Sequence, residues 1–134
     1  MQLDGNLKIV FNKTRIIYEQ TEKSLFQREF PVKQITPLCE APGILFVTNE
    51  RIYYQPHHSL NGKKVVQLTI NQLTQFFKRR YKLADGGLEL ATADEAYYFL
   101  FELEDDMNAV YFSVQGLLPS SCKTEDTPVL ELTK

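Results

Sequence analysis

Alternation of apolar and polar residues runs through the middle of the chain and predicts β-strands. In "VVQLTI", Val66, Leu68 and Ile70 fall on one face, and the polar residues between them fall on the other. Six further segments are apolar runs or partial alternations bounded by turn residues: 30–38, 44–48, 51–56, 75–83, 88–92 and 96–103. Seven short strands with short connections are typical of a β-sandwich or barrel.

The period changes after the last of these segments. In "DDMNAVYFSVQGLLP" the apolar residues follow helical spacing and form one stripe: Met107, Val110, Tyr111, Val114, Leu117 and Leu118. Asp105 or Asp106 is expected to cap this helix, and Pro119 to stop it. The pattern therefore predicts a mainly β (α+β) fold, a seven-stranded antiparallel barrel or sandwich capped by one C-terminal α-helix.

The ends of the chain are less regular than its middle. Residues 1–29 are expected to form an N-terminal extension, in which "NLKIVF" suggests a strand and "TRIIYEQTEKSLF" a short helix with Ile17, Thr21 and Leu25 on one side. Residues 30–118 form the predicted domain. Residues 119–134 are expected to be a linker, polar at first and apolar at Leu130 and Leu132.

Composition limits the class of protein. A chain of 134 residues with 43% hydrophobic content is long enough for one domain with a core of its own. Its two cysteines, Cys39 and Cys122, lie far apart and have no histidine at metal-ligand spacing, so we expect a reducing, cytosolic compartment and no metal or cofactor. No run approaches the roughly 20 apolar residues of a membrane span, so any membrane contact is expected to be peripheral.

The net charge of −2 conceals two blocks of opposite sign. Residues 51–84 contain no acid, whereas residues 85–106 contain eight acids and no Lys or Arg. Such blocks either dock onto a charged partner or neutralise each other when the chain folds back, and neighbouring strands usually pair.

The sequence contains few residues in patterns typical of catalysis or of nucleic-acid binding. His57 and His58 adjoin Ser59 in a predicted loop, where no third group orients an imidazole, so solvated loop residues are the better interpretation. The seven Tyr and nine Phe do not accompany a basic net charge, which favours core aromatics over base stacking. We therefore expect no enzyme and no nucleic-acid partner.

The stretch "QFFKRRYKLADGGLEL" predicts a β-hairpin. A turn at residues 84–87, whether two or four residues long, sets Leu83 opposite Leu88 and Lys82 opposite Glu89. Asp94 is then close to Lys78.

The same alternation assigns the remaining bases of this stretch to different faces. Arg80 is left unpaired on the outer face, whereas Arg79 falls on the apolar face with Phe77 and Tyr81. A buried guanidinium needs a partner, so Arg79 is expected to find a carboxylate of the acidic block, to reach solvent at the sheet edge, or to meet an acidic group of another domain.

Four segments in order, "ITPLCEAPG", "LFVTNERIYYQP", "VVQLTINQLTQFFKRRYKL" and "GLEL", resemble the pleckstrin-homology-like (PH-like) domain that precedes BEACH domains in the beige/neurobeachin family. The related GRAM domain shares the same barrel. The resemblance covers about residues 30–118 and implies a barrel capped by one helix. It also implies a scaffold that packs against the BEACH domain of the same protein and acts in vesicle traffic; residues 119–134 would lead toward that domain.

Acidic phospholipid is the alternative partner. The loop at residues 39–44, which is basic in phosphoinositide-binding relatives, contains Glu40 and no base, so tight headgroup binding is not expected. The candidate interface or lipid-contact residues are Lys63, Lys64, Lys78, Arg79, Arg80 and Lys82.

Overall fold

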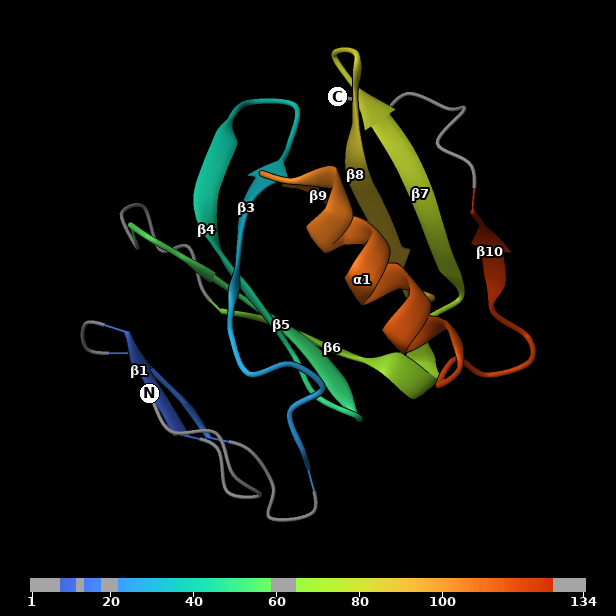
Figure 1. Cartoon of the computed structure of the whole chain (residues 1–134), viewed down its shortest axis with the longest axis horizontal. Coiled ribbons are helices and arrows are strands. Elements are labelled where there is room, and N and C mark those ends of the chain that lie inside the picture. Colours follow the sequence, from blue (N-terminus) through green and yellow to red (C-terminus); the bar gives the residue numbers. More distant parts are fainter. Residues whose placement is uncertain (1–7, 12–13, 18–21, 59–64, 127–134) are drawn as a thin grey trace.

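One curled antiparallel sheet and a single helix make up most of the protein in the computed structural model, which describes residues 8–11, 14–17, 22–58 and 65–126 (Figure 1). Seven successive strands form the sheet: β3 (Phe30–Ile35), β4 (Glu40–Val47), β5 (Arg51–Pro56), β6 (Val66–Thr69), β7 (Gln75–Tyr81), β8 (Ala84–Ala91) and β9 (Ala96–Phe101). Their order across the sheet is β7-β8-β9-β3-β4-β5-β6, all antiparallel. A 3-10 turn, η2 (Ile70–Gln72), follows β6. The predicted mainly β class and its seven strands are confirmed.

Helix α1 (Glu104–Gln115) crosses the hollow side of the sheet and closes the core (Figure 1). Met107, Val110, Tyr111 and Val114 are all fully buried, and the ring of Tyr111 stacks on that of Phe76 with centroids 5.1 Å apart. The apolar stripe predicted from helical spacing is therefore confirmed over these turns, because a helix can bury a stripe of this width against a sheet.

The predicted helix cap is wrong. Leu103 precedes the first turn in an extended conformation, and no side chain caps the free N–H groups. Three acids, Glu104, Asp105 and Asp106, lie inside the first turn, where the positive end of the helix dipole stabilises them. The helix ends before Gly116, three residues ahead of Pro119.

The N-terminal extension contains a two-stranded antiparallel sheet, β1 (Lys8–Phe11) and β2 (Thr14–Ile17). The predicted strand in "NLKIVF" is confirmed, but the predicted helix is wrong where it overlaps β2, since β-branched residues favour strands. Thr21 lies outside the described residues. Leu25 donates its backbone N–H to the carbonyl of Val47, 3.1 Å away, which ties the segment to β4.

A short strand also forms within the predicted linker. Strand β10 (Lys123–Glu125) adds to the free edge of β7 in parallel, with Lys123 opposite Gln75 and Glu125 opposite Phe77. Among the described residues the sheet therefore has eight strands, and this edge is where the chain returns after α1 (Figure 1).

Candidate functional site

The turn between the basic strand β7 and strand β8 lies at residues that the sequence does not mark as a turn. The two turn residues are Lys82 and Leu83, with φ of 48° and 71°, and Tyr81 pairs with Ala84. Positive φ at both positions is the geometry of a two-residue hairpin turn. The predicted turn at residues 84–87 is wrong, because those residues already belong to β8.

Gly86 is needed within β8 and not in a turn. A Cβ at this position would lie 3.1 Å from the carbonyl oxygen of Phe101, which is tighter than an ordinary carbon–oxygen contact. Glycine therefore serves a close approach between β8 and the end of β9.

Lys82 lies at the hairpin tip and contacts Glu40, not Glu89 as predicted. Its Nζ is 3.3 Å from Oε2 of Glu40, which also accepts a 2.5 Å hydrogen bond from the hydroxyl of Tyr81. The Tyr81 bond, followed by that from Lys82, lowers the pKa of Glu40. The bond to Glu40 in turn raises the pKa of Lys82. This exposed pair leaves the Lys82 charge locally balanced.

Arg79 forms the most enclosed ion pair on β7. Its Nε and a terminal nitrogen lie 2.7 and 2.6 Å from Oε1 of Glu89, and both side chains are largely buried. The expectation that a carboxylate of the acidic block partners Arg79 is confirmed. Its predicted place on the core face is wrong, because Phe76 and Lys78 occupy that face.

Arg80 is not unpaired, contrary to the prediction. Its Nε donates to Oδ1 of Asp85 at 2.8 Å, across a register shift between Arg79 and Tyr81. Both side chains are partly exposed, so the pair is a surface pair of the kind that contributes between about 0 and 1 kcal/mol.

Lys78 is the one candidate on β7 without an acidic partner among the described residues. It is 7% exposed, and its Nζ lies 4.8 Å from the ring centroid of Tyr111 and 4.7 Å from that of Phe112. The predicted neighbour Asp94 forms no ion pair with it. Removing a charge from water costs several kcal/mol, whereas each cation–π contact contributes about 0.5–2 kcal/mol.

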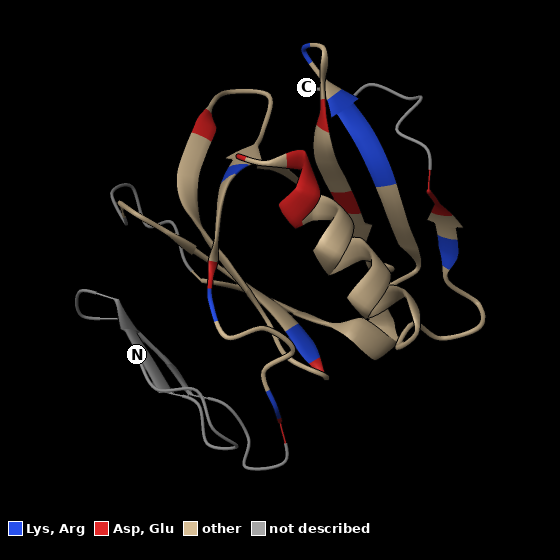
Figure 2. Cartoon of the chain, in the orientation of Figure 1, with Lys and Arg blue, Asp and Glu red and all other residues tan. Residues whose placement is uncertain are grey.

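The last two candidates, Lys63 and Lys64, lie outside the described residues. Figure 2 shows Lys and Arg along the upper part of β7, and Asp and Glu in the first turn of α1. Over the described ranges, no group of His, Cys, Asp or Glu is arranged to hold a metal ion. No helix described by the structure is long and apolar enough to cross a membrane.

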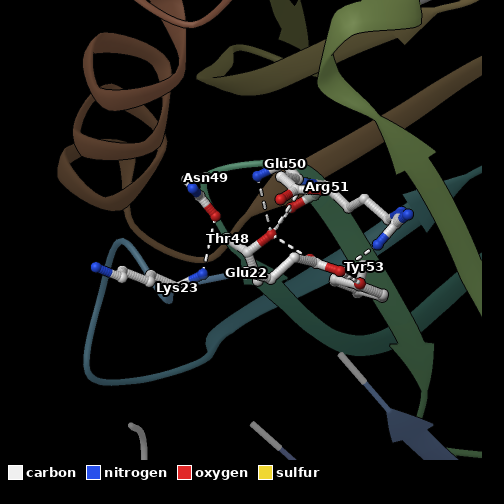
Figure 3. Close-up of polar contacts among 7 residues, drawn as sticks. All are labelled: Glu22, Lys23, Thr48, Asn49, Glu50, Arg51 and Tyr53. Atoms are coloured by element: carbon white, nitrogen blue, oxygen red, sulfur yellow. Dashed lines mark hydrogen bonds and ion pairs between the residues drawn. The ribbon is translucent and has the colours of Figure 1, made fainter. Parts of the chain in front are cut away.

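A buried polar cluster that sequence reasoning missed joins the N-terminal extension to the β4–β5 hairpin (Figure 3). The Glu22 carboxylate is fully buried, accepts hydrogen bonds from the hydroxyls of Thr48 at 2.6 Å and Tyr53 at 2.9 Å, and forms an ion pair with Arg51. Burial raises the pKa of the Tyr53 phenol well above its usual range. Every group in this cluster has a partner, so it is a structural tie. No local pattern signals it, since Glu22 is 26 residues from Thr48.

Several hollows flank the sheet. A cavity of about 410 Å³ lies among β3, β4, β9 and the start of β8, and its lining includes Lys33, His57 and Glu102. An open groove of about 700 Å³ lies beside β6, between the turn at residues 36–39 and Tyr97, and none of the described residues that line it is Lys or Arg. At its rim Leu38 is 95% exposed.

Comparison with known proteins identifies the fold. No model of a protein family matches the chain. The N-terminal PH domain of human ARAP2 superposes with a TM-score of 0.53 at 14% identity, covering 68% of this chain and 77% of that one. The C-terminal domain of an unknown protein from Leishmania infantum gives a TM-score of 0.55 at 15% identity, covering 68% and 84%. The protein has a PH-like fold.

Proposed function

We propose that this domain is a non-catalytic PH-like interaction module of a BEACH-domain protein, in which it packs against the BEACH domain and supports vesicle trafficking or membrane-associated signalling. The PH-like fold supports the general class. The sequence resemblance to PH-like domains before BEACH domains, including that of the factor associated with neutral sphingomyelinase activation, supports the partner. The packing between the two domains is the part of this proposal that the fold alone does not support.

One observation carries the preference for a protein partner over a phosphate. Arg79, Arg80 and Lys82 are each held by a carboxylate of the same chain, in the pairs with Glu89, Asp85 and Glu40. A phosphate would have to displace a carboxylate from each of them. These three bases are therefore poorly placed to bind a phosphate headgroup.

Several side chains on and beside α1 are apolar and exposed, in contrast to the paired charges of the β7–β8 hairpin. Leu103 is 57% exposed, Phe112 61% and Leu117 40%. Aromatic and aliphatic residues that stay exposed in this way are common at protein–protein contacts. We expect Phe112, the exposed aromatic residue of α1, to take part in the contact with the BEACH domain.

Isothermal titration with a separately made BEACH domain tests the proposal. The expected result is saturable binding that weakens by about tenfold in Phe112→Ala, as for a central aromatic at an interface. The variant Phe77→Ala changes an aromatic on the opposite face and is the control. Absence of measurable heat and of co-elution would exclude this function.

A peripheral membrane module that binds acidic phospholipid is the second candidate. Leu38 is almost fully exposed in the turn between β3 and β4, and His57 lies close to the start of β4, where its backbone N–H donates to the carbonyl of Pro42 at 2.9 Å. An exposed leucine and bases together suit an anionic bilayer surface, and Lys63 and Lys64 follow His58 by five and six residues in the sequence. Sedimentation with phosphoinositide-containing and neutral vesicles decides between the two candidate functions. If the membrane candidate is correct, the double change Lys63→Glu and Lys64→Glu should abolish binding to the phosphoinositide-containing vesicles.

A further inference from the structure

The buried ammonium group of Lys78 contacts aromatic rings and, among the described residues, no carboxylate. Its side chain points from β7 toward α1, on the same face as Phe76, and no carboxylate of the described residues pairs with it. Its ammonium group lies 4.7 Å from the centroid of the Phe112 ring, which is itself 61% exposed. The charge is thus close beneath the surface, in a low-dielectric setting that strengthens its attraction for an anion.

The edge of β7 next to Lys78 accepts an added strand in this structure. Strand β10 covers only Gln75–Phe77 of the seven residues in β7, and Lys123 donates its backbone N–H to the carbonyl of Thr74 at 3.0 Å. Lys123 and Thr124 are exposed. A three-residue edge strand with this little burial is weakly held.

The acidic residues of the tail at Lys123–Asp126 complement the basic strand β7, beside which the tail lies. Extending the parallel register by one residue brings Asp126 beside Lys78, and alternation puts it on the same side of the sheet. Burial raises the pKa of the Tyr111 phenol, and the charges of Asp126 and Glu125 add to that rise, so both acids act on the ring that Lys78 contacts. Asp126 nevertheless makes no ion pair with Lys78.

We propose that the free edge of β7, with Lys78 and Phe112, is a strand-addition site for an extended acidic segment of a partner protein, and that Lys123–Asp126 occupies it in cis. The partner strand takes the backbone hydrogen bonds of β10. An acidic side chain at the register of Asp126 pairs with Lys78, and an apolar neighbour packs on Phe112. The site shares Phe112 with the proposed BEACH contact, but the tests below use Lys78 and the β7 edge and do not involve that domain.

Peptide binding to the whole chain tests the proposal. Glu125→Pro removes an N–H from β10 and opens the edge. The peptide probe is fluorescein-labelled KTEDTPVLELTK, the sequence of residues 123–134, and its matched control is KTQNTPVLQLTK, in which every acid is an amide. Fluorescence anisotropy should show the acidic peptide binding E125P at least about tenfold more tightly than the unchanged chain, and at least about tenfold more tightly than the amide peptide.

Two further variants assign the charge preference to Lys78. In the E125P background, Lys78→Met keeps the apolar stem and removes the charge, so both peptides should bind equally. Lys82→Met removes a charge from the hairpin tip and should leave the preference unchanged. Equal binding of both peptides to E125P, or no binding by an E125P chain that melts cooperatively, would overturn the proposal.

Amide exchange of the unchanged chain gives a check that does not need E125P to fold. The Lys123 amide should exchange at least about tenfold faster than that of Leu90, which pairs with Tyr97 in the centre of the sheet. Equal protection of the two amides would show that the tail does not open, and the proposal would then be wrong.

Discussion

At the scale of single residues, the atoms around a glycine decide whether a larger side chain at that position would destabilise the fold. A Cβ on Gly43 would lie 2.4 Å from the carbonyl oxygen of Gln55 and 2.6 Å from the ring of Tyr54, both parts of the neighbouring strand β5. A Cβ on Gly116, just after α1, would have no atom within 4 Å. Neither position needs a positive φ, so the difference between them is one of space.

Gly43→Ala is expected to lower the free energy of unfolding by about 1–3 kcal/mol, the usual cost of forcing extra volume into a packed site. Gly116→Ala is the matched control and should be neutral or slightly stabilising, since its φ of −71° suits alanine. Urea unfolding of both variants measures the difference. Equal midpoints would contradict the steric account.

Tyr81 is expected to control the ionisation of Glu40. The hydrogen bond from its hydroxyl is the main reason why the pKa of Glu40 lies below the ordinary value of 4.5. A lowered pKa means that this contact stabilises the fold above about pH 4.5 and is lost as the pH falls through the pKa of the folded state. Tyr81→Phe should raise the Glu40 pKa in an NMR titration, whereas Tyr98→Phe should not.

At the scale of elements, the β7–β8 hairpin contains two ion pairs in different environments. Arg79 and Glu89 have side chains that are 14% and 6% exposed, whereas those of Arg80 and Asp85 are 42% and 34% exposed. Solvent screens the second pair but hardly the first. The hairpin therefore depends on one ion pair far more than on the other.

Glu89→Gln is expected to destabilise the protein by about 2–4 kcal/mol, because it leaves the guanidinium of Arg79 enclosed without a counter-charge. Asp85→Asn should cost less than about 1 kcal/mol. Thermal unfolding of the two variants at low and at moderate salt tests the contrast. Similar losses for both would show that enclosure does not distinguish the pairs.

At the scale of the whole molecule, the Glu22 cluster makes part of the N-terminal extension a component of the domain. The carboxylate is shared by Arg51 and two hydroxyls on the β4–β5 hairpin (Figure 3). A buried carboxylate with three donors is stabilised only while all of them stay in place. The connection therefore links the extension to barrel stability.

Glu22→Gln should lower the free energy of unfolding by about 2–4 kcal/mol by leaving Arg51 and the hydroxyls poorly matched. Tyr53→Phe removes a single donor and should cost about 1 kcal/mol. Urea unfolding monitored by tyrosine fluorescence distinguishes the two. If Glu22→Gln is as stable as the unchanged chain, the cluster does not hold the extension.

Between residues 30 and 115, the sequence by itself determined which segments become strands and which becomes the helix. Periods of 2 and 3.6 depend only on which residues must leave water, and the stripe containing Met107 and Val114 is buried as its spacing predicted. Only the tertiary structure decided the register of β7, the partners of its bases, β10 and the Glu22 cluster. The turn at Lys82 and Leu83 lacks the glycine that would announce a positive φ. The other contacts join residues distant in the chain, whose meeting depends on how whole elements pack.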